Sequence, residues 1–482
     1  MTQNNLFQRR LSHVGLVALG ARLALVTVSV AVCMALPAAQ AFATGETITD
    51  IRIKGNARTS EETIRSMIPI SIGDELERDT LESVREQLNN TGMFSSVNVY
   101  WERSEGGVRV VVNIKEKFPW APIPTFTFSP GETAFGAVLV HGNLFGRGKQ
   151  GVIGGRISTV SQGALVGYRD PSIMGTWLYW QMEAAFSQLD TPEYSPFSKY
   201  RAVKIRTTDL SGVGGSANFG VFWFRRVRTE LRYGFHRYKY GGTEFNEEAL
   251  PGSSIVGPAI IDDDSVLHRG FGEARLQFDF RAFEHALMKG SALSLSYQVG
   301  SPTFLSDKNI NYWKTGVSYE KGIIFFKTQN FRFRSGVSVS DRLPLFEEHT
   351  AGATNLRGFL YQQFRGDTQV RIAPEYHVPL SPSKWAFSVR GLVFTDIQAL
   401  WYRNLPSGYG PGQVQAGRGD GGRSYLGPEY LKPGFSPTRD IHVGVGAGLR
   451  FYLRTVAVPL VGFDYGYGVL DNAWRMVLVV GL

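Results

Sequence analysis

Cysteine is almost absent from this sequence, which has a single one, Cys33, among 482 residues. Cys33 lies in an N-terminal segment with the pattern of a secretory leader, so the chain left after cleavage would contain no cysteine. Such a chain needs no disulfide and offers no thiol for catalysis or for oxidation.

Charged residues are also few, at 19% of the chain, and the mean hydropathy is −0.11. This hydropathy argues against a bundle of membrane-spanning helices, but it is compatible with a membrane β-barrel, in which only alternate residues face lipid. The 55 glycines and the 13% of aromatic residues are typical of twisted strands and tight turns. The net charge of +9 is spread along the chain, so we expect no nucleic-acid partner.

The first residues have the features of a signal peptide, which we predict at 1–43. Arg9 and Arg10 precede an apolar run at 23–36, and two overlapping A-x-A cleavage patterns follow at 39–43. Arg22 interrupts the apolar stretch, so a membrane-spanning helix is not expected there.

Residues 46–118 have the pattern of a small α+β domain with the element order β-α-α-β-β. Ser60 and Glu61 mark the start of a first helix, Pro69 ends it, and a second helix is predicted over 78–90. Strands are predicted before the helices, from Ile48, and after them, at 97–101 and 108–114.

Residues 120–482 change to segments of about ten residues in which apolar and polar side chains alternate between turns rich in Gly, Pro, Asn and Asp. This pattern predicts a 16-stranded antiparallel transmembrane β-barrel. The alternative is a soluble β-sandwich. The barrel is favoured because the polar faces, such as that of 441–453, carry Arg, His and many Gly, which fits a wet lumen. Long connections at 241–267, 343–368 and 402–439 are expected at the end opposite the N-terminal domain.

One of these connections contains Leu356-Arg357-Gly358-Phe359, and each of the next two strands carries one acid, Glu375 or Asp396, at a position predicted to face inward. A guanidinium group can meet carboxylates through paired hydrogen bonds, which are strengthened where water is partly excluded. The sequence therefore predicts a latch across the lumen. The alternative is an ordinary charge in a solvated loop.

Together these segments resemble a known family, the outer-membrane insertase and translocase superfamily of BamA and TamA type, or bacterial surface antigen barrels. The N-terminal domain resembles one POTRA domain. The motifs that carry the resemblance in the barrel include the loop around Arg357, the strand 371–380, Phe394-Thr395-Asp396, and the two later segments that contain Arg450 and Asp464. The sequence differs from the family pattern at Gln398, where Gly is frequent, and at Leu482, where Phe is usual.

The resemblance implies an outer-membrane protein with its POTRA domain in the periplasm. It implies that the loop of Arg357, Gly358 and Phe359 folds into the lumen and docks against the wall that carries Glu375 and Asp396. It also implies a seam that opens between the first and last strands, and the residues expected at this seam are Phe126, Phe128, Trp474 and Leu482. The implied partners are the lipid bilayer, extended polypeptide clients that add a strand to the POTRA domain, and periplasmic accessory proteins.

We therefore expect a protein that assembles or translocates polypeptides at the outer membrane. A dedicated two-partner-type secretion transporter, a lipid transporter and a passive porin-like channel are the alternatives. The sequence contains no G-x-S-x-G motif, phosphate-binding loop or cluster with metal-ligand spacing, so neither an enzyme nor a cofactor is expected.

Overall fold

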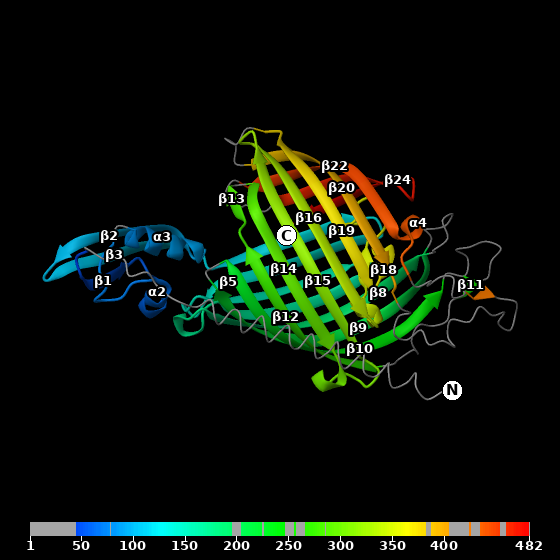
Figure 1. Cartoon of the computed structure of the whole chain (residues 1–482), viewed down its shortest axis with the longest axis horizontal. Coiled ribbons are helices and arrows are strands. Elements are labelled where there is room, and N and C mark those ends of the chain that lie inside the picture. Colours follow the sequence, from blue (N-terminus) through cyan, green and yellow to red (C-terminus); the bar gives the residue numbers. More distant parts are fainter. Residues whose placement is uncertain are drawn as a thin grey trace, which may run out of the picture. The chain divides into compact units, whose positions relative to one another are not determined.

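The structure is a computed structural model, and it describes residues 45–77, 79–194, 204–223, 226–245, 255–256, 266–284, 286–381, 387–403, 424–425, 434–453 and 459–481. An N-terminal domain is followed along the chain by a β-barrel (Figure 1). The predicted signal peptide, with Cys33, and the C-terminal Leu482 lie outside the described residues. Among the described residues, no helix is both long and apolar enough to cross a membrane.

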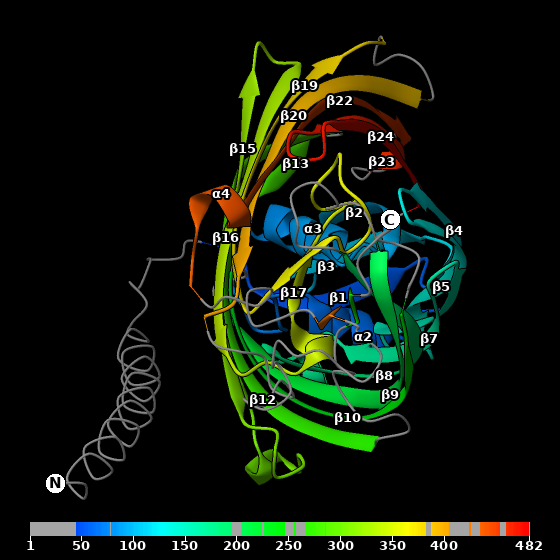
Figure 2. The same ribbon diagram turned by 90° about the vertical axis from the view of Figure 1, so that its right-hand side faces the viewer.

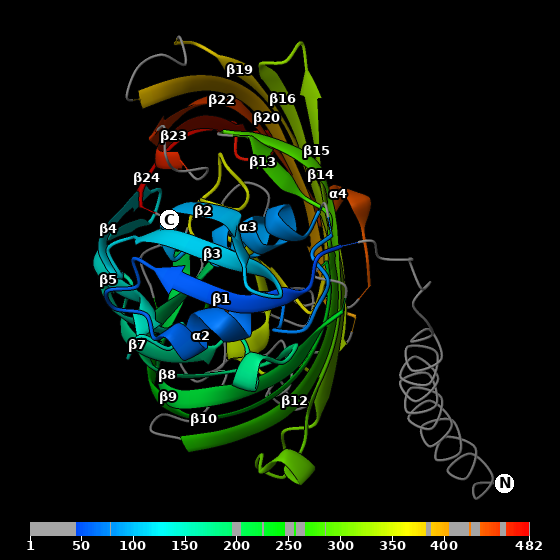
Figure 3. The ribbon, with the colours of Figure 1, turned by 90° about the vertical axis from the view of Figure 1, so that its left-hand side faces the viewer.

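The N-terminal domain has the predicted β-α-α-β-β order. Its elements are β1 (Ile48–Lys54), α2 (Glu61–Met67), α3 (Thr80–Asn90), β2 (Phe94–Ser104) and β3 (Gly107–Glu116). Helix α2 begins where the Ser60 side chain accepts a hydrogen bond from the backbone N–H of Thr63, with an oxygen-to-nitrogen distance of 3.1 Å. The sheet order is β1-β3-β2, so β3 is the central strand (Figure 3).

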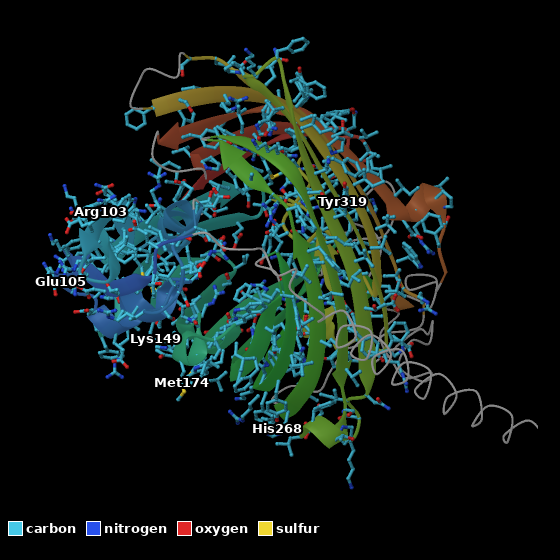
Figure 4. The ribbon with its side chains drawn as sticks, turned by 60° about the vertical axis from the view of Figure 1, so that its left-hand side comes forward. Arg103, Glu105, Lys149, Met174, His268 and Tyr319 are labelled. Atoms are coloured by element: carbon cyan, nitrogen blue, oxygen red, sulfur yellow. The ribbon has the colours of Figure 1, made fainter. Side chains whose placement is uncertain are left out.

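The two edges of this small sheet differ. The segment that follows α2 covers the outer edge of β1, because Gly73 donates a backbone hydrogen bond to Ile48 and Leu76 donates one to Glu46, at 2.8 and 2.9 Å. Within the described part of the chain, no backbone hydrogen bond reaches the outer edge of β2. Arg103 and Glu105 mark the tip of the β2–β3 hairpin (Figure 4). The free edge of this domain is therefore that of β2.

The barrel is closed and antiparallel, as predicted (Figure 2), and the described residues supply sixteen strands to it. Strand β12 is continued by β13, and both pair with β14, so the two count as one. The strands are β4 (Trp120–Ser129), β5 (Glu132–Leu144), β6 (Lys149–Ser158), β7 (Ser161–Asp170), β8 (Leu178–Tyr194), β9 (Lys204–Trp223), β10 (Val227–Phe245), β12 (Val266–Asp279), β13 (Ala282–Glu284), β14 (Leu287–Gly300), β15 (Tyr312–Phe325), β16 (Gln329–Asp341), β19 (Thr368–Pro379), β20 (Phe387–Trp401), β22 (Ile441–Leu453), β23 (Pro459–Gly468) and β24 (Ala473–Val480).

The two ends of the barrel are distinct. We call the end at which the chain enters β4 the proximal end, and the opposite end the distal end. Because strand direction alternates, the three long connections predicted from the sequence all leave from the distal end. The shorter elements of this part of the chain are η1 (Ile173–Gly175), β11 (Ile255–Val256), η2 (Pro302–Phe304), η3 (Leu345–Glu347), β17 (His349–Ala351), β18 (Phe364–Gly366), β21 (Ser424–Tyr425) and α4 (Pro437–Asp440).

Side chains alternate between the outside of the barrel and its lumen along each strand. The outer face carries large exposed apolar residues, such as Tyr319, which is labelled in Figure 4. Others are Phe135, Ile153, Phe186, Phe219, Leu231, Val317, Val337, Val393 and Trp474. This apolar exterior is what a lipid-facing wall requires.

The inner wall is not uniformly polar, which differs from the expectation of a wet lumen. Register places Val138, Gly154 and Leu165 of β5, β6 and β7 on one inward-facing row. Leu165 is 43% exposed there. This row of β5, β6 and β7 is therefore apolar, whereas β10 to β23 carry most of the inward charges.

Candidate functional site

The connection between β16 and β19 carries the candidate site, and we call residues 352–363 of it the arginine loop. Strands β17 and β18 of this connection, in yellow, lie within the ring of barrel strands (Figure 2). The guanidinium group of Arg357 binds both carboxylate oxygens of Asp396 on β20, with Nε to Oδ2 at 2.7 Å and Nη2 to Oδ1 at 2.8 Å. The backbone N–H of Arg357 donates to the same carboxylate at 3.1 Å. Arg357 is 4% exposed and Asp396 is 2% exposed.

Glu375 on β19 is the second acid of the site. Its Oε1 lies 2.8 Å from Nη2 of Arg357 and 2.8 Å from Nη2 of Arg334, which projects from β16. Its Oε2 lies 3.1 Å from Nε2 of His377. The Arg357 guanidinium also stacks on the ring of Phe394, with 3.4 Å from Cζ to the ring centroid. Glu375 is thus shared between the arginine loop and the wall.

Asp464 on β23 is a third acid at Arg357, which the sequence did not predict to join this cluster. Its Oδ2 lies 3.4 Å from Nη1 of Arg357. Arg450 of β22 binds Asp464 with two hydrogen bonds of 2.8 Å. Burial alone would lower the pKa of Arg357, but its hydrogen bonds with Asp396 and the charges of Asp396, Glu375 and Asp464 raise that pKa above its usual value. The guanidinium therefore remains charged at any physiological pH.

The backbone of the arginine loop packs directly on the barrel wall. Gly358 has a φ of +97°, and a Cβ atom there would lie 2.5 Å from the backbone nitrogen of Gly468 on β23. A Cβ atom on Gly444 of β22 would lie 2.0 Å from the carbonyl oxygen of Arg357. Only glycine fits such approaches without displacing the loop.

Apolar packing and an amide also hold the loop. Phe359 is fully buried in a cluster with Leu356 and Leu400. Its ring lies edge-on to that of Phe364, with 5.2 Å between centroids. Gln398, at the position where the sequence differs from the family pattern, is fully buried and donates a hydrogen bond to the carbonyl oxygen of Asn355. The amide therefore serves as an anchor for the loop.

The first and last strands of the barrel meet along a short seam. Their ladder has three residue pairs, in which Phe128 faces Leu478 and Phe126 faces Val480, whereas β23 and β24 share eight pairs. The adjoining part of β4 contains Pro122 and Pro124, which have no backbone N–H to donate. The seam is therefore held by few backbone hydrogen bonds.

Of the residues that the sequence assigned to the seam, Phe126 and Phe128 lie in this ladder. Trp474 lies on β24 beyond the ladder and stacks on Tyr465 of β23, with 4.9 Å between ring centroids. Trp474 therefore supports the last hairpin and does not pair with β4.

The arginine loop spans this seam at the distal end. On one side, the backbone N–H of Tyr361 donates to the carbonyl oxygen of Pro130, in the β4–β5 turn, at 2.8 Å. On the other side, Arg475 of β24 donates to the carbonyl oxygen of Gly358 at 2.5 Å, and Gln363 donates to Asp471 of the β23–β24 turn at 3.0 Å. The loop thus bonds to the first and the last hairpin of the barrel.

The structure therefore brings Arg357, Glu375 and Asp396 together, as the sequence predicted, and joins Arg450 and Asp464 to the same cluster. It adds contacts that the sequence reading missed, those of Arg334 and of Arg475. The alternation of side chains along each strand does place these two arginines on the lumen side. It does not give their height along the barrel axis, because that height depends on the register between neighbouring strands.

These features define a class of protein: a membrane β-barrel with an inward-folded arginine loop and one N-terminal α+β domain. Residues 143–473 match the Omp85 superfamily domain, and residues 46–117 match the POTRA family described as a surface antigen variable number repeat. The chain belongs to the Omp85 superfamily of outer-membrane β-barrels, and its N-terminal domain is a POTRA domain. A search of curated protein sequences finds no match.

Solved structures show the same fold. BamA from Haemophilus ducreyi lacking POTRA domains 1–3 is 15% identical, with 90% of this chain and 84% of that chain covered and a TM-score of 0.61. CdiB from Acinetobacter baumannii is 12% identical, with coverages of 90% and 74% and a TM-score of 0.57. CdiB from Escherichia coli is 16% identical, with coverages of 90% and 76% and a TM-score of 0.57. At these identities the likeness concerns the fold alone.

Proposed function

We propose that this protein inserts or translocates polypeptides at the bacterial outer membrane, with its POTRA domain in the periplasm. The observation that carries the proposal is the seam of three residue pairs between β4 and β24, bridged by the arginine loop. A seam with few hydrogen bonds can part at low cost, and the two strand edges then exposed can pair with an incoming strand.

The POTRA domain offers the first binding site for a client in this proposal. The outer edge of β2 presents a row of backbone donors and acceptors to which an extended segment can add as a further strand. Because β1 is covered on its own outer side by the segment with Gly73 and Leu76, augmentation is proposed at β2.

Two observations favour this role over a passive channel. The arginine loop lies in the lumen and is fixed to the wall by buried ion pairs, which a simple pore does not require. The inward row with Val138 and Leu165 is apolar next to the seam, which suits contact with a client more than the passage of hydrated solutes. No catalytic step or cofactor forms part of the proposed function.

A disulfide across the seam tests the proposal. Thr127 and Val479 are direct partners and face the lumen, so the pair Thr127→Cys and Val479→Cys should lock β4 to β24. The locked protein is expected to lose complementation, which a reductant should restore. A matched pair across β23 and β24, Val461→Cys with Val480→Cys, should form its disulfide without loss. Full activity of the locked seam would refute lateral opening.

The client is identified by depletion followed by quantitative proteomics of the outer membrane and of secreted proteins. The proposal predicts a broad loss of barrel proteins if the chain is an assembly factor. Loss of one secreted protein would indicate a dedicated two-partner-type transporter, and a defect limited to lipid asymmetry would indicate lipid transport.

A further inference from the structure

A cavity of about 740 Å³ lies along the inner wall of the barrel, on the side away from the seam. Seven neighbouring strands contribute to it, β9, β10, β12, β14, β15, β16 and β19. With strands spaced about 4.8 Å apart, the five intervals from β10 to β19 make this stretch of wall roughly 24 Å wide. The volume falls within the usual range of small-ligand sites.

The floor of the cavity is built from small side chains. The three central strands are β14, β15 and β16. Residues of these strands that lie on the same face as Arg334 and Arg371, according to the pairing between strands, face the lumen. The small inward residues that line the cavity are Ala292, Ser294, Ser296, Gly316, Ser318, Gly336 and Ser338. The floor therefore leaves space above it and offers hydroxyl groups, while Phe222 of β9 is the large apolar side chain that faces inward at its rim.

Positive charge dominates the margins of this floor. The lining contains the carboxylates of Asp279 and Glu320 and five arginines, Arg226, Arg228, Arg281, Arg334 and Arg371. Arg281 binds both carboxylates, with 2.7 Å to Asp279 and 2.5 Å to Glu320. Arg334 pairs with Glu375, 2.8 Å away, which belongs to the arginine-loop site.

Three of these arginines have no carboxylate partner among the described residues. Arg228 donates to the amide oxygen of Gln277, and Arg226 lies over the ring of Phe280, with 5.8 Å from Cζ to the centroid. Arg371 forms no ion pair with the described residues, and its buried Nε has no hydrogen-bond partner there. Arg228 and Arg371 stand on β10 and β19, at opposite margins of the small-residue floor.

We propose that this cavity binds a hydrophilic ligand that carries two or more phosphate groups. Guanidinium groups bind phosphate oxygens through paired hydrogen bonds, and basic groups at both margins match phosphates at both ends of one ligand. The hydroxyl-bearing floor suits a sugar or similar polyol between those phosphates.

A phosphorylated ligand fits better than an acidic peptide. Three arginines have no carboxylate partner among the described residues, Arg281 faces two carboxylates and Arg334 pairs with Glu375, so two positive charges remain in excess in this cavity. Each phosphate carries up to two negative charges and three acceptor oxygens, so two phosphates can balance this excess. A peptide would need one acid at each margin, and each carboxylate offers only two acceptor oxygens. The phosphates can belong to a soluble sugar phosphate or to a lipid headgroup, and both sources present the same chemistry.

The test uses the purified full chain in detergent and isothermal titration calorimetry with a hexose bisphosphate, the unphosphorylated hexose and hexaglutamate. We expect binding of the bisphosphate only, and weaker binding as salt concentration rises. The double variant Arg228→Gln with Arg371→Gln should weaken binding by at least about tenfold, because it removes two charge-assisted contacts. Micelles that contain a phosphatidylinositol bisphosphate, added in a separate arm, show whether a headgroup is preferred to the soluble ligand.

Two further variants separate specific binding from loss of fold or general charge. Arg237→Gln removes an exposed arginine from the outer face of β10 and should leave affinity within about twofold. Ser318→Leu fills the exposed floor without changing charge and should also abolish binding, with heat-modifiable mobility intact. No binding of either phosphorylated probe, tighter binding of hexaglutamate, or an equal effect of Arg237→Gln would overturn the proposal. None of these outcomes bears on polypeptide transport, which rests on the seam.

Discussion

Arg357 and Asp396 form a bidentate ion pair that is almost completely buried inside the barrel, with nitrogen-to-oxygen distances of 2.7 and 2.8 Å. Removing two charges from water is costly, so a buried pair adds little net stability over an apolar one, whereas the loss of one partner leaves the other charge uncompensated. Here three carboxylates converge on one guanidinium group. The position of the arginine loop therefore depends on Arg357 more than on any other side chain in it.

Arg357→Ala should destabilise the barrel strongly. Breaking a buried ion pair costs about 3–5 kcal/mol, and here Asp396, Glu375 and Asp464 would lose a shared cation. The measurement is the temperature at which heat-modifiable mobility on gels is lost. Arg342→Ala, in the same connection, is the control, because the Arg342 side chain is 56% exposed and should change the transition little.

The charge alone should not suffice at position 357. Arg357→Lys keeps a cation but cannot reproduce the paired hydrogen bonds to Asp396, so it should behave more like Arg357→Ala than like the wild type. A lysine variant with wild-type mobility and complementation would show that the site needs only a positive charge.

Gly358→Ala should displace the arginine loop. A Cβ atom at this position would lie 2.5 Å from the backbone nitrogen of Gly468 and 2.6 Å from the carbonyl carbon of Tyr467. Gly434 provides a matched control, since its φ of +100° is nearly the same as the +97° of Gly358 but no atom lies within 4 Å of its Cβ position. Gly434→Ala should cost about 1 kcal/mol from backbone strain alone.

Limited proteolysis of the loop between β16 and β19 distinguishes these two substitutions. The alanine at position 358 should make this loop susceptible in folded protein, and the alanine at position 434 should leave it protected. Equal protection in both variants would show that the loop tolerates a side chain against β23.

The small sheet of β17 and β18 should open in acid through His349. Burial, followed by the positive charge of Lys314, lowers the pKa of His349 to about 3. The buried Nε2 has no hydrogen-bond partner among the described residues. In the unfolded segment the pKa is about 6.5. As the pH falls, the unfolded segment therefore binds a proton before the folded one does. The free energy of opening that depends on neutral His349 is complete above about pH 6.5 and is lost progressively as the pH falls toward 3.

Amide hydrogen exchange in β17 and β18 measures this effect. After correction for the intrinsic pH dependence of exchange, the two strands should open more at about pH 4.5 than at neutral pH. His349→Asn should reduce this difference between the two pH values, because it removes the titrating group. An identical pH dependence in both proteins would rule out His349 as the cause.

The sequence predicted much of the fold because its signals are local. Alternation and turn residues predicted a barrel of sixteen strands, and Ser60 with Pro69 marked the ends of the first helix. The alternation of side chains along the strands also placed Glu375 and Asp396 on the inner face, where both contact Arg357. Each of these inferences requires only the order of residues along one segment.

The contacts that the alternation of side chains could not predict depend on the register between strands. Asp464 lies 107 residues after Arg357, and its contact depends on how far β23 is shifted along β22. The short ladder of Phe126 and Phe128 with β24, and the cavity with Arg228 and Arg371 at its margins, likewise result from the closure of the whole barrel.

The most direct test of the account is the distance across the distal end of the seam, since its central claim is that the loop anchored by Arg357 holds the first and last hairpins together. Spin labels at Thr133 and Asn472, in a background without Cys33, report this distance by pulsed electron spin resonance. We predict one narrow distribution in the wild type and in Arg342→Ala, and a longer, broader one in Arg357→Ala. An unchanged narrow distribution in folded Arg357→Ala protein would contradict the account.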